Sequence, residues 1–193
     1  MNEPIWVNYH KHTSLSNKWL KDSPLLPVDY WNELKARYGD KSCIYTTVEH
    51  GWAGNYFKQY DDLEKFNKKN GTNIRWIYGA EAYWVKDRHE SDRSNCHIVL
   101  LARTDKGRKA INKILSIANK DGYYARPRID IELIDQLPID DVMITTACIA
   151  FWNKYDDIDD IVKHLSTSFP HFYLEVQAHN TPQQKELNRR IIQ

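Results

Sequence analysis

Residues 5–14 read IWVNYHKHTS and residues 43–51 read CIYTTVEHG, and in both stretches β-branched and aromatic residues run directly into histidines. Residues of these two kinds are enriched in β-strands. We therefore expect strands at residues 5–9 and 43–48, with imidazole side chains placed where each strand ends.

The same alternation of strand and helix continues along the chain. Pro27 is suited to open a helix and Gly39 to close it, and Gly71 closes a second helix in the same way. Further strands are expected at residues 74–85 with a break at Gly79, and at 97–102, 142–147 and 172–176. Further helices are expected after Asp105, at residues 156–169, and from Thr181 onward. This succession predicts an α/β fold with parallel strands joined by right-handed crossovers.

Length and composition favour one globular domain over residues 1–193, with 41% hydrophobic and 27% charged residues. The formal net charge of +1 gives no global field for holding nucleic acid non-specifically. Three scattered cysteines and the absence of a secretory leader pattern indicate a reducing, cytoplasmic compartment. No apolar run reaches the roughly 20 residues that span a bilayer, so we expect no membrane contact.

His10 and His12 lie two residues apart at the end of the first expected strand, so their side chains would point to the same side. Other donors follow later strand ends or begin a strand: Glu49, His50, Glu81 and His97. Mixed nitrogen and oxygen donors suit zinc, manganese or iron better than magnesium or calcium. Two such ions can support hydrolysis of a phosphoryl group.

Seven short motifs together resemble the PHP domain of bacterial DNA polymerase III alpha subunits, a metal-dependent phosphoesterase family. They are, in order, VNYHKHTS (7–14), TVEHG (47–51), YGAEAYWV (78–85), CHIVLLAR (96–103), GYYARPRID (122–130), TTACIA (145–150) and FYLEVQAH (172–179). The resemblance covers nearly the whole chain. It implies a distorted (β/α)7-like barrel with up to three metal ions at the C-terminal edge of its strands.

The resemblance also implies roles for individual residues. The implied metal ligands are His10, His12, Glu49, His50, Glu81, His97 and Cys148, of which His10, His12, Glu49 and His50 are also implied to be catalytic. Without the resemblance, Cys148 would be read as a small buried hydrophobe. The implied partners are the 3′ end of single-stranded DNA and the rest of a polymerase within the replisome.

Two departures from the family pattern affect the expected site. Glu49 stands where the family usually has aspartate, which moves the carboxylate outward by roughly 1 Å. The sequence ends before the family's final Asp-x-His motif. We therefore expect fewer than three ions and a barrel without its last strand and helix. The chain would be a piece of a longer protein or a domain completed by another polypeptide.

Arg126 and Arg128 flank Pro127 in the basic sequence YYARPR. Two guanidinium groups on a stiff loop suit phosphate oxygens, so contact with phosphate or nucleic acid is one interpretation. The alternative is that they pair with Asp130 or Glu132, or face a neighbouring domain. Aromatic residues at helical spacing are expected in the core rather than on a base-stacking surface: Trp31, Tyr56, Tyr60 and Phe66.

Three functions stay open on this reading. The leading hypothesis is the N-terminal PHP domain of a bacterial or phage replicative polymerase, acting as a 3′ to 5′ exonuclease or as a structural platform. The second is a separate phosphoesterase of the histidinol phosphatase type. The third is an interaction module with one structural zinc or none.

Overall fold

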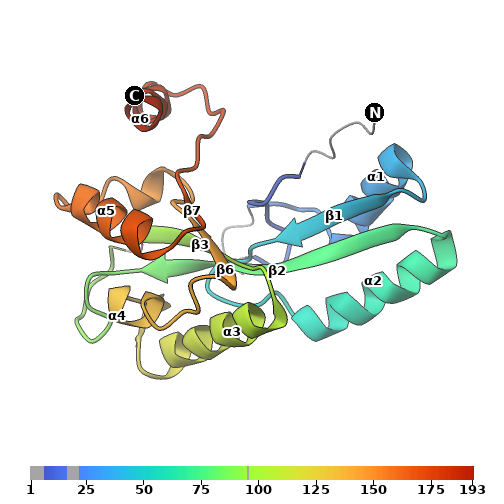
Figure 1. Cartoon of the computed structure of the whole chain (residues 1–193), viewed down its shortest axis with the longest axis horizontal. Coiled ribbons are helices and arrows are strands. Elements are labelled where there is room, and N and C mark those ends of the chain that lie inside the picture. Colours follow the sequence, from blue (N-terminus) through green and yellow to red (C-terminus); the bar gives the residue numbers. More distant parts are fainter. Residues whose placement is uncertain (1–6, 17–21, 95) are drawn as a thin grey trace. The chain divides into compact units, whose positions relative to one another are not determined.

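A computed structural model describes residues 7–16, 22–94 and 96–193. The chain divides into two compact units, Met1–Ala80 and Glu81–Gln193. The boundary lies inside strand β2 (Asn73–Trp84), so the units follow one another without a linker (Figure 1). The expectation of a single domain over residues 1–193 stays a prediction.

The first unit contains α1 (Pro27–Tyr38), β1 (Ser42–Thr47), α2 (Tyr56–Asn70) and the beginning of β2. Pro27 opens α1, and Gly39 follows it with a positive φ of 61°. β1 pairs with β2 in parallel, in a register that runs from Ser42 opposite Asn73 to Thr47 opposite Tyr78. The predicted first helix and second strand are thus confirmed within one residue.

One aromatic core joins these four elements. Trp31, Cys43, Tyr45, Leu63 and Ile74 form its buried centre. Trp31 and Tyr45 meet edge to face with ring centroids 5.9 Å apart, a favourable geometry for aromatic pairs. Phe66 packs against this cluster, as expected, but Tyr60 is 46% exposed, so its predicted core position was wrong.

The second unit contains the end of β2 and a mixed set of strands. The strands are β3 (Cys96–Ala102), β4 (Tyr123–Tyr124), β5 (Arg126–Ile129), β6 (Val142–Thr145) and β7 (Phe172–Tyr173). β5 is parallel to β2 and β7 is parallel to β6, whereas β3 and β6 are antiparallel. The pairing of β3 with β6 therefore departs from the parallel strands that the alternation of strand and helix predicted.

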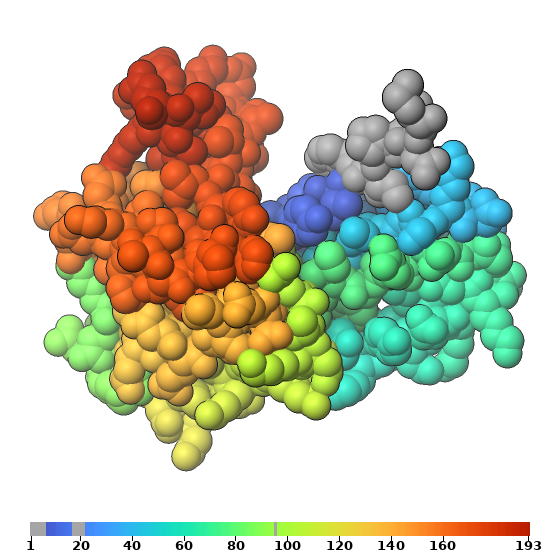
Figure 2. Space-filling view, viewed as in Figure 1, coloured from blue at the N-terminus to red at the C-terminus, as the bar shows by residue number. Residues whose placement is uncertain are grey.

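Helices of the second unit alternate with these strands. They are α3 (Asp105–Lys120), α4 (Ile131–Ile134), the 3-10 helix η1 (Ile149–Phe151), α5 (Ile158–Ser168) and α6 (Pro182–Ile192). Thr104 caps α3 by accepting a hydrogen bond from Gly107 N. A Cβ at Gly107 would lie 2.0 Å from Asp141 O, so α3 packs directly on the segment before β6. α3 (lime) and that segment meet on the face drawn in Figure 2.

Four local expectations were wrong. Residues 7–9 form no strand, while residues 5 and 6 lie outside the described residues. β2 runs through Gly79 without a break, because β1 pairs with it before the glycine and β5 after it. The sequence YYARPR is not a loop but the hairpin of β4 and β5, which turns at Ala125 with φ 61°. The last strand covers only Phe172–Tyr173 rather than residues 172–176.

The fold is mixed α/β, as expected from the sequence, and is consistent with part of a (β/α) barrel of the PHP type. Among the described residues, no helix combines the length and the apolar character needed to cross a membrane.

Candidate metal centre

In the first unit, residues 10–16 are positioned by the residues that follow β1. Residues 48, 49 and 50, which follow β1, each form hydrogen bonds with one residue of the segment 10–16. The pairs are Val48 with Lys11, Glu49 with Thr13, and His50 with Ser16. The histidine motif is therefore held beside the end of β1, although its own backbone forms no strand.

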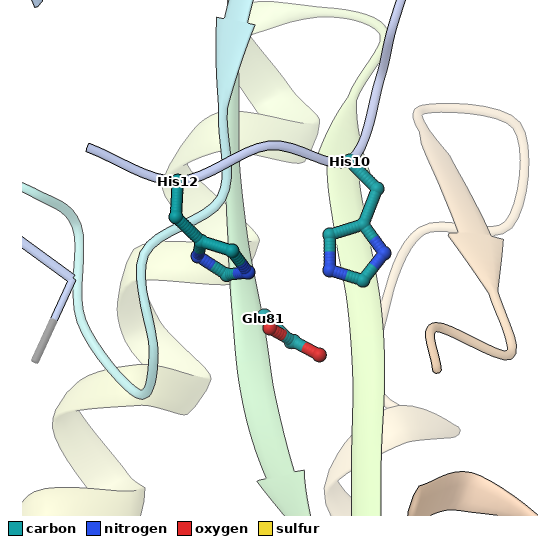
Figure 3. Close-up of side chains that lie close together, drawn as sticks. All are labelled: His10, His12 and Glu81. Atoms are coloured by element: carbon teal, nitrogen blue, oxygen red, sulfur yellow. The ribbon is translucent and has the colours of Figure 1, made fainter. Parts of the chain in front are cut away.

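This arrangement brings the predicted histidines together. The His12 and His50 rings stack with centroids 4.6 Å apart, and the His10 ring meets His12 edge to face at 5.3 Å. The rings of His10 and His12 point to the same side of the segment (Figure 3). Ser16 Oγ lies 2.8 Å from His12 Nδ1, which orients the ring and leaves Nε2 as the nitrogen for a metal.

Asp22 is a donor that sequence reasoning missed. Its Oδ2 lies 3.2 Å from His50 Nε2. One donor atom each from His12, Asp22 and His50 lies within 4.8 Å of the others. No spacing or periodicity in the sequence KDSP at residues 21–24 distinguishes this aspartate, so only the folded chain identifies it.

Glu49 is directed elsewhere. Its carboxylate is 1% exposed and accepts hydrogen bonds from Thr13 Oγ1 at 2.6 Å and Thr13 N at 3.2 Å. Burial raises the pKa of Glu49, and the Thr13 hydrogen bonds oppose that shift. Among the described residues, Glu49 belongs to no cluster of donor atoms that could hold an ion. Its predicted ligation stays a prediction without support from this geometry.

In the second unit, three predicted ligands from three elements meet. His97 on β3 places Nδ1 3.0 Å from Glu81 Oε1 on β2 and 3.4 Å from Cys148 Sγ, just before η1. Glu81, labelled in Figure 3, is the residue directly after the boundary between the units. Ala147, before Cys148, has a φ of 49°, an uncommon conformation for a residue with a Cβ that turns the chain after β6.

Electrostatics around His97 reflect these contacts. Burial, the largest influence, lowers the pKa of His97, but hydrogen bonds with Cys148 and Glu81 outweigh it and raise the pKa to about 9. The raised pKa favours a proton on the His97 ring, which lies beside the Glu81 carboxylate and the Cys148 sulfur. This donor set fits a divalent ion that accepts nitrogen, oxygen and sulfur ligands.

The two arginines of the basic hairpin have different surroundings. Arg126 lies over the Tyr83 ring, 4.7 Å from its centroid, and donates to Tyr83 Oη. The Tyr83 ring in turn packs against His97 at 5.3 Å. Arg126 is therefore one aromatic ring away from a predicted ligand.

Arg128 is 2% exposed, and its guanidinium donates to backbone carbonyls of the chain. The accepting oxygens belong to Gly122, Arg88, Glu90 and Asp92. These bonds fix the loop after β2 and speak against the predicted phosphate contact of Arg128. The carboxylates expected to pair with it, Asp130 and Glu132, bind Arg88 instead.

The geometry agrees with the class of protein that the motifs suggested. A model of the PHP domain family matches residues 8–179, and the chain belongs to that family. The match includes all seven predicted ligands and both arginines of the hairpin.

Among named proteins, the chain is similar to DNA polymerase III subunit alpha. The relative from Aquifex aeolicus is 31% identical over 208 residues, which cover 97% of this chain and 17% of the relative. Those from Borreliella burgdorferi and Thermus aquaticus are 28% and 24% identical, covering 97% and 95% of this chain. The chain thus spans only 17%, 16% and 15% of the length of these three relatives.

Proposed function

We propose that this chain acts as the PHP domain of a replicative polymerase of the DNA polymerase III alpha type, and that it hydrolyses phosphodiester bonds at the 3′ end of single-stranded DNA with divalent metal ions. The observation that carries the proposal is the approach of donor atoms from His12, Asp22 and His50 within 4.8 Å. The similarity to alpha subunits supports the substrate class.

We further propose that each unit carries its own set of metal donors, which are His10, His12, Asp22 and His50 in the first unit and Glu81, His97 and Cys148 in the second. Carboxyl ends of parallel strands converge in α/β folds, where they carry the ligands of active sites.

These residues would hold the ions, and their nitrogen, oxygen and sulfur donors fit zinc, manganese or iron. Such ions would neutralise charge on the phosphoryl group and supply hydroxide at neutral pH. Ser16 would keep the His12 ring in its binding orientation. Arg126, held against Tyr83, would orient a phosphate oxygen through its remaining N–H donors.

The experiment is metal analysis of the purified chain together with hydrolysis of a 3′-labelled single-stranded oligonucleotide in manganese. We expect bound transition metal and shortening from the 3′ end. The double variant His12→Ala, His50→Ala should lose both. The matched control is His164→Ala, because this exposed histidine pairs only with Asp135 among the described residues. A metal-free wild-type chain that leaves DNA intact would overturn the proposal.

A second candidate is a structural domain within the replisome that binds metal without hydrolysis. The specific observation in its favour is that Glu49, at a position implied to be catalytic, gives both oxygens to Thr13. The same experiment separates the two. Metal that raises the melting temperature while the oligonucleotide stays intact would favour the structural role. A cytoplasmic location follows from either candidate.

A further inference from the structure

A pocket of about 180 Å³ opens in the first unit between the segment before α1, α1 itself and β1. Eight residues line it: Asn8, Lys11, Tyr30, Glu33, Leu34, Arg37, Tyr38 and Ile44. The wall from α1 consists of residues three and four apart, which lie on one face of a helix. All of the lining belongs to one unit, so the pocket is independent of the division at Ala80.

Lys11 places its ammonium group in this pocket against two aromatic rings. Its Nζ lies 5.1 Å from the centroid of the Tyr30 ring and 5.4 Å from that of Tyr45. Across residues 7–16, 22–94 and 96–193, no carboxylate forms an ion pair with it. Contact with aromatic faces offsets part of the cost of burying an ammonium group. An ammonium group has three N–H donors, which an anion in the pocket would satisfy.

The other polar residues that line the pocket are Glu33, Arg37 and Asn8. Arg37 Nε lies 2.6 Å from Glu33 Oε1, so these two side chains neutralise each other at the exposed side of α1. Asn8 accepts from His10 N with its side-chain oxygen, and its amide nitrogen supplies two further donors. The pocket therefore has a net positive charge from Lys11 and neutral donors beside it.

We propose that this pocket binds a small phosphorylated molecule, with its phosphate on the Lys11 ammonium group and the Asn8 amide. A phosphate accepts several hydrogen bonds and matches a lysine as a compact point charge. Leu34, Tyr38 and Ile44 give the remaining wall an apolar and aromatic character that fits a flat organic group.

The size of the pocket limits the ligand. Pockets for drug-sized ligands enclose roughly 300–1,000 Å³, well above the volume found here. A phosphate carrying one ring matches this volume better than a larger ligand does. The site is thus distinct in ligand and in residues from the proposed metal centre.

The test is calorimetric titration of the full chain, kept in EDTA so that metal-bound phosphate does not contribute. The probes are phenyl phosphate, inorganic phosphate and phenol. We expect phenyl phosphate to bind tightest, because only it satisfies both the ammonium group and the apolar wall. Equal affinity for phenol and phenyl phosphate would mean a merely apolar pocket and would overturn the proposal.

Variants locate the binding. Lys11→Met keeps the stem but removes the charge, and should weaken phenyl phosphate by about tenfold or more. Lys68→Met, on the exposed side of α2, is the matched control and should leave the affinity unchanged. Equal affinities in the wild type and both variants would contradict the proposal.

A variant of opposite sign covers the case in which Lys11→Met fails to fold. Glu33→Gln removes the carboxylate from the pocket and releases Arg37, so phenyl phosphate should bind about threefold tighter. Because Glu33 is exposed, the fold should tolerate this change. Unchanged or weaker binding in Glu33→Gln would overturn the proposal on its own.

Discussion

Thr13→Val tests whether Glu49 is anchored by Thr13 rather than serving as a metal ligand. Thr13 is fully buried, and its hydroxyl donates to Glu49 Oε1 at 2.6 Å while accepting from Leu15 N at 3.2 Å. Valine has nearly the same shape, so the change opens no cavity. It removes one donor from a buried carboxylate and one acceptor from a backbone N–H.

The expected cost follows from these two losses. A buried polar group without its partner costs about 1–3 kcal/mol, and more when it is charged. We therefore expect Thr13→Val to lower the free energy of unfolding by about 2–4 kcal/mol, measured by urea denaturation. For a chain of this size that corresponds to a fall in melting temperature of roughly 5–15 °C. Thr13→Ser keeps the hydroxyl and should cost about 1 kcal/mol or less.

A double-mutant cycle isolates the contact. In a Glu49→Gln background, Thr13→Val should cost at least about 1 kcal/mol less, because the buried charge has been removed. Glu49→Gln should also keep the metal content of the wild type. The interpretation fails if Thr13→Val stays within about 0.5 kcal/mol of the wild type, or if Glu49→Gln loses metal as the double histidine variant does.

Three further outcomes are expected. Gly54→Ala should lower the free energy of unfolding by about 2–4 kcal/mol in urea denaturation, because the new Cβ would lie 2.7 Å from Glu49 Cγ at a φ of 58°. Gly39→Ala is the control, since Gly39 has a similar φ but no atom within 4 Å of the new Cβ, and it should cost only about 1 kcal/mol. Asp22→Asn should weaken zinc binding about tenfold in a competition titration with a chelating dye, while the circular dichroism spectrum stays unchanged. Hydrogen bonds from the side chains of Thr104 and Lys106 lower the pKa of Asp141 in the folded chain. Asp141 therefore stabilises the fold at pH values above its unfolded pKa of about 3.9, and this stabilisation is lost as the pH falls through the folded pKa. In urea denaturation, Asp141→Asn should be less stable than the wild type at pH 7 and equally stable at the lowest pH of the series.

Most helices could be predicted because their ends are marked by local chemistry. Pro27 fixes φ at the start of α1, and Gly39 and Gly71 adopt the positive φ that closes α1 and α2. The ends of strands are harder to predict, because they depend on backbone hydrogen bonds to adjacent strands that can lie far away in the sequence. Gly79 was expected to break β2, yet β2 continues because it is paired on both sides of the glycine.

In the candidate site, side-chain contacts between distant parts of the sequence were likewise not predictable. The types of donor and their order along the chain could be read from the motifs, and His10, His12 and His50 do gather. Asp22 could not be found, because only the folded loop brings it to His50. The partners of Arg128 could not be predicted for the same reason, since the four carbonyls around its guanidinium come from segments up to 40 residues away.

We propose that one methylene group explains why Asp22, rather than Glu49, supplies the carboxylate beside His50. The longer side chain of Glu49 reaches Thr13, and this contact lies between the Val48 and His50 contacts that hold residues 11 and 16. The three contacts hold residues 11–16 beside the end of β1, so Glu49 would position the histidines without binding an ion. An oxygen donor would then be needed beside His50, and Asp22 lies 3.2 Å from its Nε2. On this proposal, a glutamate in the second motif leaves the number of metal-binding carboxylates unchanged and moves one of them from a strand end to a loop.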